Sequence, residues 1–110
     1  MKNRIDKVNQ LIKEKIADIL LKDIFVRDVL ITVQDVDTTR DLKYTKIKVS
    51  VMPFNKSQEV LKILKKQQPK IQKELNLFLK IKFVPKIIFG IDETEEKASR
   101  IEGILRKLGK

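Results

Sequence analysis

Apolar residues recur with two different periods along this chain of 110 residues. In residues 3–21 they follow steps of three and four, as on one face of an α-helix, and a helical period returns in residues 57–78. In residues 44–52 they alternate, as in a strand with one buried face. The pattern therefore predicts an α+β domain in which a three-stranded sheet is covered by helices on one face.

Three strands are expected. The β-branched run at residues 29–36 and the alternating run at residues 44–52 predict an antiparallel hairpin around a polar turn. Residues 80–91 predict a third strand, with Ile81 and Phe83 facing inward and Pro85 at an edge or bulge. A long helical connection precedes this strand and permits one parallel pairing, and a C-terminal helix is expected from about residue 92.

Pro69 interrupts the helical pattern of residues 57–78. A proline inside a helix removes a backbone donor and clashes with the preceding turn. We therefore expect two helices joined by a kink at Gln67-Gln68-Pro69, with Pro69 in the first turn of the second helix. Asn3 and Ser57 are the expected N-caps of the first helix and of this kinked pair.

Positive charge is concentrated in one part of the chain. The chain carries 25 Lys and Arg against 15 Asp and Glu, a net charge of +10, and residues 61–90 alone hold 8 of the basic and 1 of the acidic side chains. Such an excess favours a polyanionic partner, whereas compositional bias alone would spread it evenly. On a helical wheel these lysines lie opposite the apolar stripe of residues 57–78: Lys62, Lys65, Lys66, Lys70 and Lys73. They are candidate phosphate contacts, and the plain alternative is a solvated outer face.

The sequence lacks the residues that most catalytic mechanisms need. The absence of Cys and His excludes thiol catalysis, imidazole zinc sites and serine-type triads, and the three glycines form no phosphate-binding loop. Asp35 and Asp37, with Asp41 nearby, could hold Mg²⁺ in a nuclease, but such residues are also ordinary in turns. We expect no enzyme, cofactor or metal in a single cytoplasmic domain, residues 1–110, without a signal peptide or membrane span.

The first helix is amphipathic and could lie on a membrane, but its acidic residues favour a place in the core. The sequence pattern also predicts that most aromatic side chains lie in the core, namely Phe54, Phe78, Phe83 and Phe89. Tyr44 falls on the wet side of its strand and could stack on a base.

Two segments carry a resemblance to a known family. Residues 36–49, which contain Thr39-Arg40-Asp41-Leu42 before the alternating strand, resemble the Ser-Arg-Asp-Leu turn and strand of the ribosome-binding factor A family. Residues 83–92, with Val84-Pro85, are similar to the family's Val-Pro-x-Leu-x-Phe-x-x-Asp segment. Gln67-Gln68-Pro69 stands where the family has an Ala-x-Gly kink, and residues 24–28 replace its Asp-Pro-Arg segment.

The resemblance implies a KH-like domain of the second topological type that binds 16S rRNA in immature small (30S) ribosomal subunits and supports late maturation and processing, particularly in cold growth. It implies a non-catalytic monomer with assembly GTPases as functional partners. The expected RNA contacts are the five helix lysines together with Lys80, Lys82, Arg40 and Lys43. A metal-dependent nuclease, a general RNA-binding module and a protein-interaction module remain open as alternatives.

Overall fold

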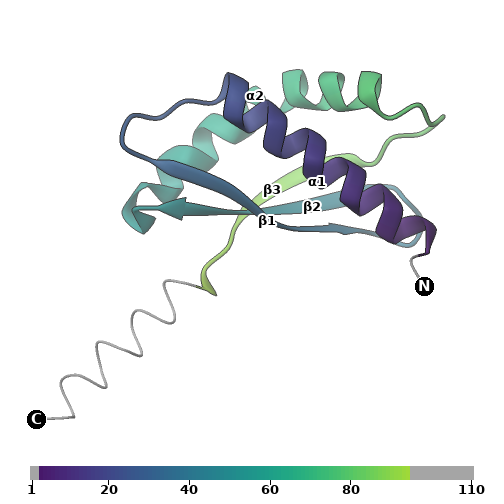
Figure 1. Cartoon of the computed structure of the whole chain (residues 1–110), viewed down its shortest axis with the longest axis horizontal. Coiled ribbons are helices and arrows are strands. Elements are labelled where there is room, and N and C mark those ends of the chain that lie inside the picture. The colour runs from purple at the N-terminus through teal and green to yellow at the C-terminus, as the bar shows by residue number, and fades with distance from the viewer. Residues whose placement is uncertain (1–2, 95–110) are drawn as a thin grey trace, which may run out of the picture.

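Two helices lie against one face of a three-stranded sheet in the computed structural model, which describes residues 3–94 (Figure 1). The elements in chain order are α1 (Arg4–Asp23), β1 (Leu30–Thr38), β2 (Tyr44–Met52), a short 3₁₀ turn η1 (Phe54–Lys56), α2 (Ser57–Phe78) and β3 (Lys86–Ile91). The α+β architecture predicted from the sequence is confirmed. The predicted C-terminal helix lies outside the described residues.

The start of α1 follows from its first four residues. Asn3 is the N-cap, as predicted, and its side-chain oxygen accepts a hydrogen bond of 2.9 Å from the backbone N–H of Asp6. The Asp6 carboxylate accepts one in return from the Asn3 N–H, which completes a capping box. Beyond the cap, Ile12 and Ile16 are fully buried and direct the helix onto the sheet.

The sheet has the order β1-β2-β3, with β1 and β2 antiparallel and β2 and β3 parallel. Both pairings agree with the predictions. A bulge between Val33 and Asp35 leaves Gln34 without a partner in the register of β1 and β2. In β2 the alternation is complete, because Thr45, Ile47, Val49 and Val51 are buried and the residues between them face outward.

The third strand is shorter than predicted. It begins at Lys86, so the predicted strand at residues 80–85 is wrong, and Ile81 and Phe83 are exposed rather than inward-facing. The cause is the register, in which Lys86 lies opposite Tyr44, the first residue of β2. Residues 80–85 extend past that end of β2, where the β1–β2 turn offers no ladder to join.

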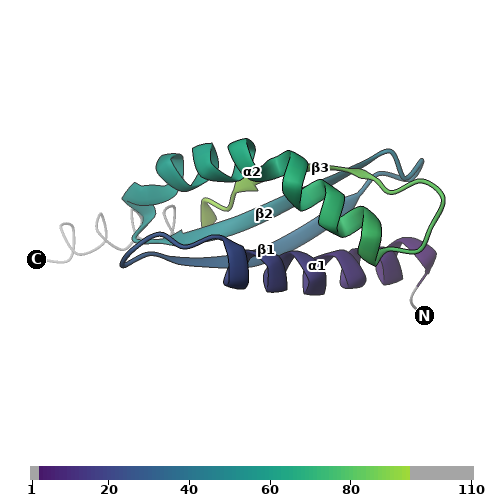
Figure 2. The same ribbon diagram turned by 90° about the horizontal axis from the view of Figure 1, so that it is seen from above.

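Helix α2 is continuous, so the prediction of two separate helices is wrong. Pro69 lies inside it, and the helix axis changes direction along its length, as Figure 2 shows. Leu64 before the proline and Ile71 after it are both buried, so both halves pack against the same core. The predicted N-cap at Ser57 is also wrong: Lys56 occupies that position, and the Ser57 hydroxyl is buried without a hydrogen-bond partner among the described residues.

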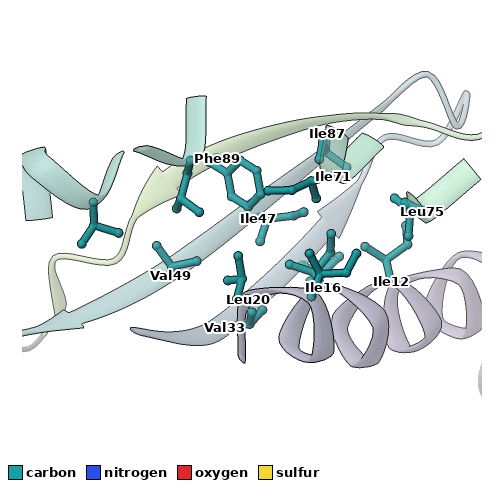
Figure 3. Close-up of a cluster of buried hydrophobic side chains, with 14 of the residues drawn as sticks. Ile12, Ile16, Leu20, Val33, Ile47, Val49, Ile71, Leu75, Ile87 and Phe89 are labelled. Carbon is teal, nitrogen blue, oxygen red and sulfur yellow. The ribbon is translucent and has the colours of Figure 1, made fainter. Parts of the chain in front are cut away.

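The core lies between the sheet and the two helices (Figure 3). Its labelled side chains come from every helix and strand: Ile12, Ile16, Leu20, Val33, Ile47, Val49, Ile71, Leu75, Ile87 and Phe89. Among the phenylalanines predicted to be core, Phe89 is buried and Phe54 is half-buried. The prediction is wrong for Phe78 and Phe83, which are exposed, because α2 ends at Phe78 and β3 has not begun at Phe83.

Candidate nucleic-acid interface

A row of exposed lysines follows the outer side of α2. Lys62, Lys65, Lys66, Lys70 and Lys73, hereafter the α2 lysine row, are all exposed, whereas the buried residues of this helix, such as Leu64 and Ile71, face the sheet. Lys62, Lys66, Lys70 and Lys73 follow one another at steps of four, four and three, which places them on adjacent turns, and Lys65 lies beside Lys66. Within residues 3–94 none of these five forms an ion pair.

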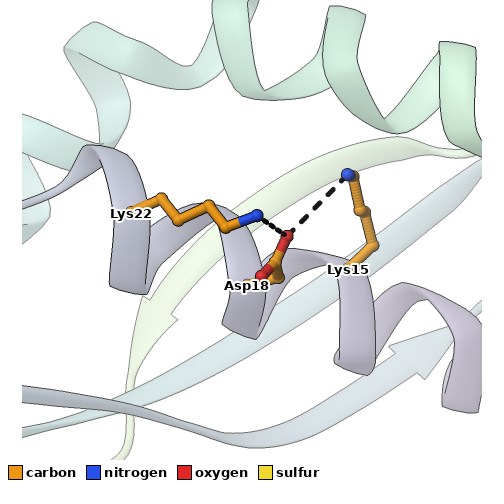
Figure 4. Close-up of polar contacts among 3 residues, drawn as sticks. All are labelled: Lys15, Asp18 and Lys22. Carbon is orange, nitrogen blue, oxygen red and sulfur yellow. Dashed lines mark ion pairs between the residues drawn. The ribbon is translucent and has the colours of Figure 1, made fainter.

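The lysines of α1 have a different environment. Asp18 accepts ion pairs from Lys15 at 3.9 Å and from Lys22 at 3.3 Å, as Figure 4 shows. Lys15 also lies over the ring of Phe78 at 5.2 Å from its centroid, which links the two helices. The positive charge of α1 is therefore partly neutralised locally, whereas none of the five lysines of the α2 lysine row has an ion pair within residues 3–94.

Two glutamines attach α2 to the outer edge of β3. The Gln72 side-chain oxygen accepts from the Ile87 N–H at 2.8 Å, and its amide group donates to the Pro85 carbonyl at 3.0 Å. Gln68 donates to the Ile87 carbonyl at 2.7 Å. These side chains satisfy backbone groups at an edge that no other strand of residues 3–94 covers, so they fix α2 relative to the segment before β3. The sequence analysis did not select these glutamines. The feature that could have indicated them is a pair of glutamines four positions apart, next to the apolar stripe of the helix.

The first cleft lies between α2 and residues 81–86 and has a volume of about 870 Å³. Gln68, Pro69 and Gln72 form one side of it, and Phe83 contributes to the other. Lys65 from the row, Lys82 and Lys86 line the same cleft. The fold thus brings two predicted site residues, Lys65 and Lys82, to one place, and it adds Lys86, which the sequence reading did not select.

The second cleft, of about 570 Å³, lies on the other side of residues 81–86. The β1–β2 turn supplies Asp41, Leu42, Lys43 and Tyr44, and α1 contributes Arg4. Two residues of the predicted site, Lys43 and Lys82, therefore line this cleft together. Arg40 and Lys80 are exposed but line neither cleft.

The β1–β2 turn is held in a defined shape by its own side chains. The Thr39 hydroxyl donates to Asp41 Oδ1 at 2.6 Å and accepts from the Tyr44 N–H at 3.2 Å, while the Lys43 N–H donates to Asp41 Oδ1 at 3.1 Å. The hydrogen bond from Thr39, followed by that from Lys43, lowers the pKa of Asp41 below its usual value. Leu42 has a φ of 60°, an unusual backbone conformation for a leucine.

The uncovered face of the sheet combines charges of both signs. Asp35 and Asp37 are exposed, and in the register they lie opposite Lys48 and Lys46, respectively. Residues 3–94 contain no group of three or more Asp, Glu, His or Cys side chains arranged to hold a metal ion. Tyr44 is 48% exposed at the start of β2, so the prediction that it faces outward is confirmed.

These features define the class of the protein. It is an α+β domain of KH-like type II topology with a row of exposed lysines along one bent helix and two clefts beside it. None of the helices formed by residues 3–94 is long and apolar enough to cross a membrane.

The chain belongs to the ribosome-binding factor A family, because residues 4–105 match that family's sequence profile. Proteins named Ribosome-binding factor A from Clostridium acetobutylicum and Desulforamulus reducens are 37% and 34% identical to it, over 97% and 98% of this chain and 91% and 92% of theirs.

Solved structures show the same fold. Ribosome-binding factor A from Thermus thermophilus superposes with a TM-score of 0.68 at 18% identity, over 81% of this chain and 97% of that one. A putative ribosome binding factor A from Thermotoga maritima gives a TM-score of 0.57 at 21% identity, over 78% and 80%.

Proposed function

We propose that this protein is a non-catalytic assembly factor that binds the immature small (30S) ribosomal subunit through 16S rRNA. In this proposal it acts as a monomer in the cytoplasm, supports late maturation and processing of that rRNA, including during cold growth, and works beside assembly GTPases. Family membership supports ribosome binding, since the relatives carry that activity in their names.

The observation that carries the proposal is the α2 lysine row. Five exposed ammonium groups at spacings of three and four positions repel one another, at a cost of about 0.2–0.5 kcal/mol for each neighbouring pair. An RNA backbone would convert this repulsion into attraction, because each phosphate neutralises a lysine and releases a condensed counterion. Lys43, Lys80, Lys82 and Arg40 are assigned as further contacts in the same proposal.

Binding of this kind acts on the RNA by selection among its conformations. A rigid cationic surface favours the arrangement of phosphates that fits it and shifts the rRNA population toward that arrangement. Lysine contacts to phosphate position the protein without reading base sequence. Recognition of one folded rRNA site therefore depends on shape and on contacts beyond the row.

Sedimentation with ribosomal fractions tests the proposal. We compare the wild type with the α2 triple variant (Lys62→Gln, Lys66→Gln and Lys73→Gln) and with the α1 triple variant (Lys7→Gln, Lys13→Gln and Lys22→Gln). Both variants lose the same charge, and all six lysines are exposed. We expect the wild type and the α1 triple variant to sediment with free small subunits but not with joined ribosomes, and the α2 triple variant to remain in the supernatant.

Two results contradict the proposal. If the wild type does not sediment with free small subunits, the assembly role is wrong. If the α2 triple variant sediments as the wild type does, the row is not the RNA-binding surface. Circular dichroism of each variant confirms that the fold is retained.

A further inference from the structure

The second cleft combines aromatic faces with positive charge. Tyr44 and Phe83 line it from opposite segments of the chain, the start of β2 and the segment before β3. Its volume of about 570 Å³ falls within the range of about 300–1,000 Å³ typical of small-ligand sites. We propose that this cleft binds one unpaired nucleotide of an RNA, with the base against Tyr44 and Phe83. The inference rests on the proposed function in taking RNA as the ligand.

The aromatic side chains are exposed where a base can reach them. Phe83 is 75% exposed and Tyr44 is 48% exposed. A single exposed aromatic residue is ordinary, and Phe25, at 86% exposure and outside both clefts, is one. Phe83 differs from Phe25 because a second aromatic side chain lines the same cleft and the Lys82 ammonium lies 5.5 Å from the Phe83 ring centroid. Paired aromatic faces among cations are the composition of single-stranded nucleic-acid sites.

The charges around the cleft match a nucleotide. Four cationic side chains line it, from Arg4, Lys43, Lys82 and Lys86, against the single carboxylate of Asp41. The hydrogen bonds that Asp41 accepts within the described chain go to Oδ1, which leaves Oδ2 as an acceptor for a base amino group or a ribose hydroxyl. A nucleotide supplies an anionic phosphate, an apolar ring and such donors together.

The site is also shaped before a ligand arrives. Thr39 and Asp41 hold the turn through side-chain hydrogen bonds, so Tyr44 and Lys43 have fixed positions at its end. A preformed site loses less conformational freedom on binding than a flexible one. Residues 81–84 and Lys86 line both clefts, so a strand bound at the α2 lysine row reaches the second cleft by crossing this segment.

Intrinsic fluorescence tests the inference without a label. Tyr44 is the only tyrosine, and the chain has no tryptophan, so the tyrosine emission reports on this cleft alone. We titrate the full chain with a short unpaired adenine-rich RNA oligonucleotide and with a fully paired RNA duplex of the same charge. The oligonucleotide is expected to quench Tyr44 to saturation, and the duplex to bind with little quenching.

The decisive comparison is Phe83→Ala against its matched control, Phe25→Ala. Loss of one stacking face is expected to weaken binding of the unpaired oligonucleotide by about 5- to 150-fold. Duplex binding by Phe83→Ala, and all binding by Phe25→Ala, should stay within about twofold of the wild type. Both side chains are exposed, so neither substitution removes core packing.

Two outcomes overturn the inference. The first is wild-type affinity of Phe83→Ala for the unpaired oligonucleotide, and the second is saturating binding of that oligonucleotide without quenching of Tyr44. If the first outcome comes with loss of small-subunit sedimentation by Phe83→Ala, Phe83 is assigned to a protein contact instead. In each case sedimentation of the wild type with small subunits reports separately on the proposed function.

Discussion

Replacing Gln72 with alanine should destabilise the whole domain, although Gln72 is only half-buried on the side of α2. The substitution leaves the Ile87 N–H and the Pro85 carbonyl without their partners, at present 2.8 and 3.0 Å away. Both residues are buried, and each backbone group left unpaired in such a site costs about 1–3 kcal/mol. Alanine recovers up to about 1 kcal/mol through helix propensity and side-chain entropy.

Taking about 1.5–2 kcal/mol for each of the two groups, because Gln72 is only half-buried and water can approach this edge, the net loss in the free energy of unfolding is expected to be about 2–3 kcal/mol. In a domain of about this size such a loss lowers Tm by roughly 10–20 °C. Urea unfolding followed by circular dichroism measures it, and an unchanged m value shows that the native state stays compact. Gln58→Ala is the matched control, because Gln58 is exposed on the same helix; it should change stability by no more than about 0.5 kcal/mol.

A loss below about 0.5 kcal/mol for Gln72→Ala would refute the reasoning. It would mean that water replaces the glutamine at the edge of β3 without cost. The companion variant Gln68→Ala removes the bond to the Ile87 carbonyl. Because both glutamines contact Ile87, the double variant should deviate from additivity, which a double-mutant cycle measures.

Two further predictions concern charge. For RNA binding by the α2 triple variant, the slope of log K against log salt concentration should decrease in magnitude by about 2–3, at roughly 0.7–0.9 per lysine. An unchanged slope would show that the row does not contact phosphates. Thr39→Val should raise the pKa of Asp41 toward its ordinary value of 3.8, measured by NMR titration of the carboxyl group, because the valine cannot donate the largest of the bonds that lower it. Since the pKa of Asp41 is lowered in the folded state, its contribution to stability is present above pH 3.8 and is lost as the pH falls through the folded pKa. The pKa of Asp92, which is also lowered, should not change in Thr39→Val and serves as the control.

Features set by local spacing were predictable from the sequence. The alternation of β2 and the Asn3 cap of α1 depend on residues within a few positions of one another, and both were predicted correctly. Residues 80–85 alternate in the same way, but they have no strand beside them because β2 starts only at Tyr44. Whether an alternating segment becomes a strand is decided by its partner, and a single sequence does not reveal where that partner begins.

In the candidate site, too, the features set by local spacing were predictable, and those set by contacts between distant segments were not. The exposure of Lys62 and Lys66 follows from the helical period, because the opposite face of α2 must pack on the sheet. The clefts do not follow, since the second joins segments about 40 residues apart, such as Tyr44 and Phe83. Phe83 was misread for this reason: its apolar ring suggested the core, and only the register shows that it lies beyond the end of the sheet.

The arrangement of α2 separates the requirements of folding from those of binding. Its buried side is anchored by Leu64, Ile71 and Leu75, and its flank by the glutamine bonds to β3, so the fold of residues 3–94 does not depend on the outer side. Lysines on the outer side therefore lower the stability of the fold only through their repulsion for one another, which water weakens. Surface ion pairs with carboxylates would contribute little stability in their place. An acidic residue added to the row would relieve that repulsion and also cancel the charge offered to a phosphate. Within the described part of the chain, the α2 lysine row has no ion pair, whereas Lys15 and Lys22 of α1 share Asp18; stability alone would disfavour the unpaired row, and the proposed RNA binding would account for it.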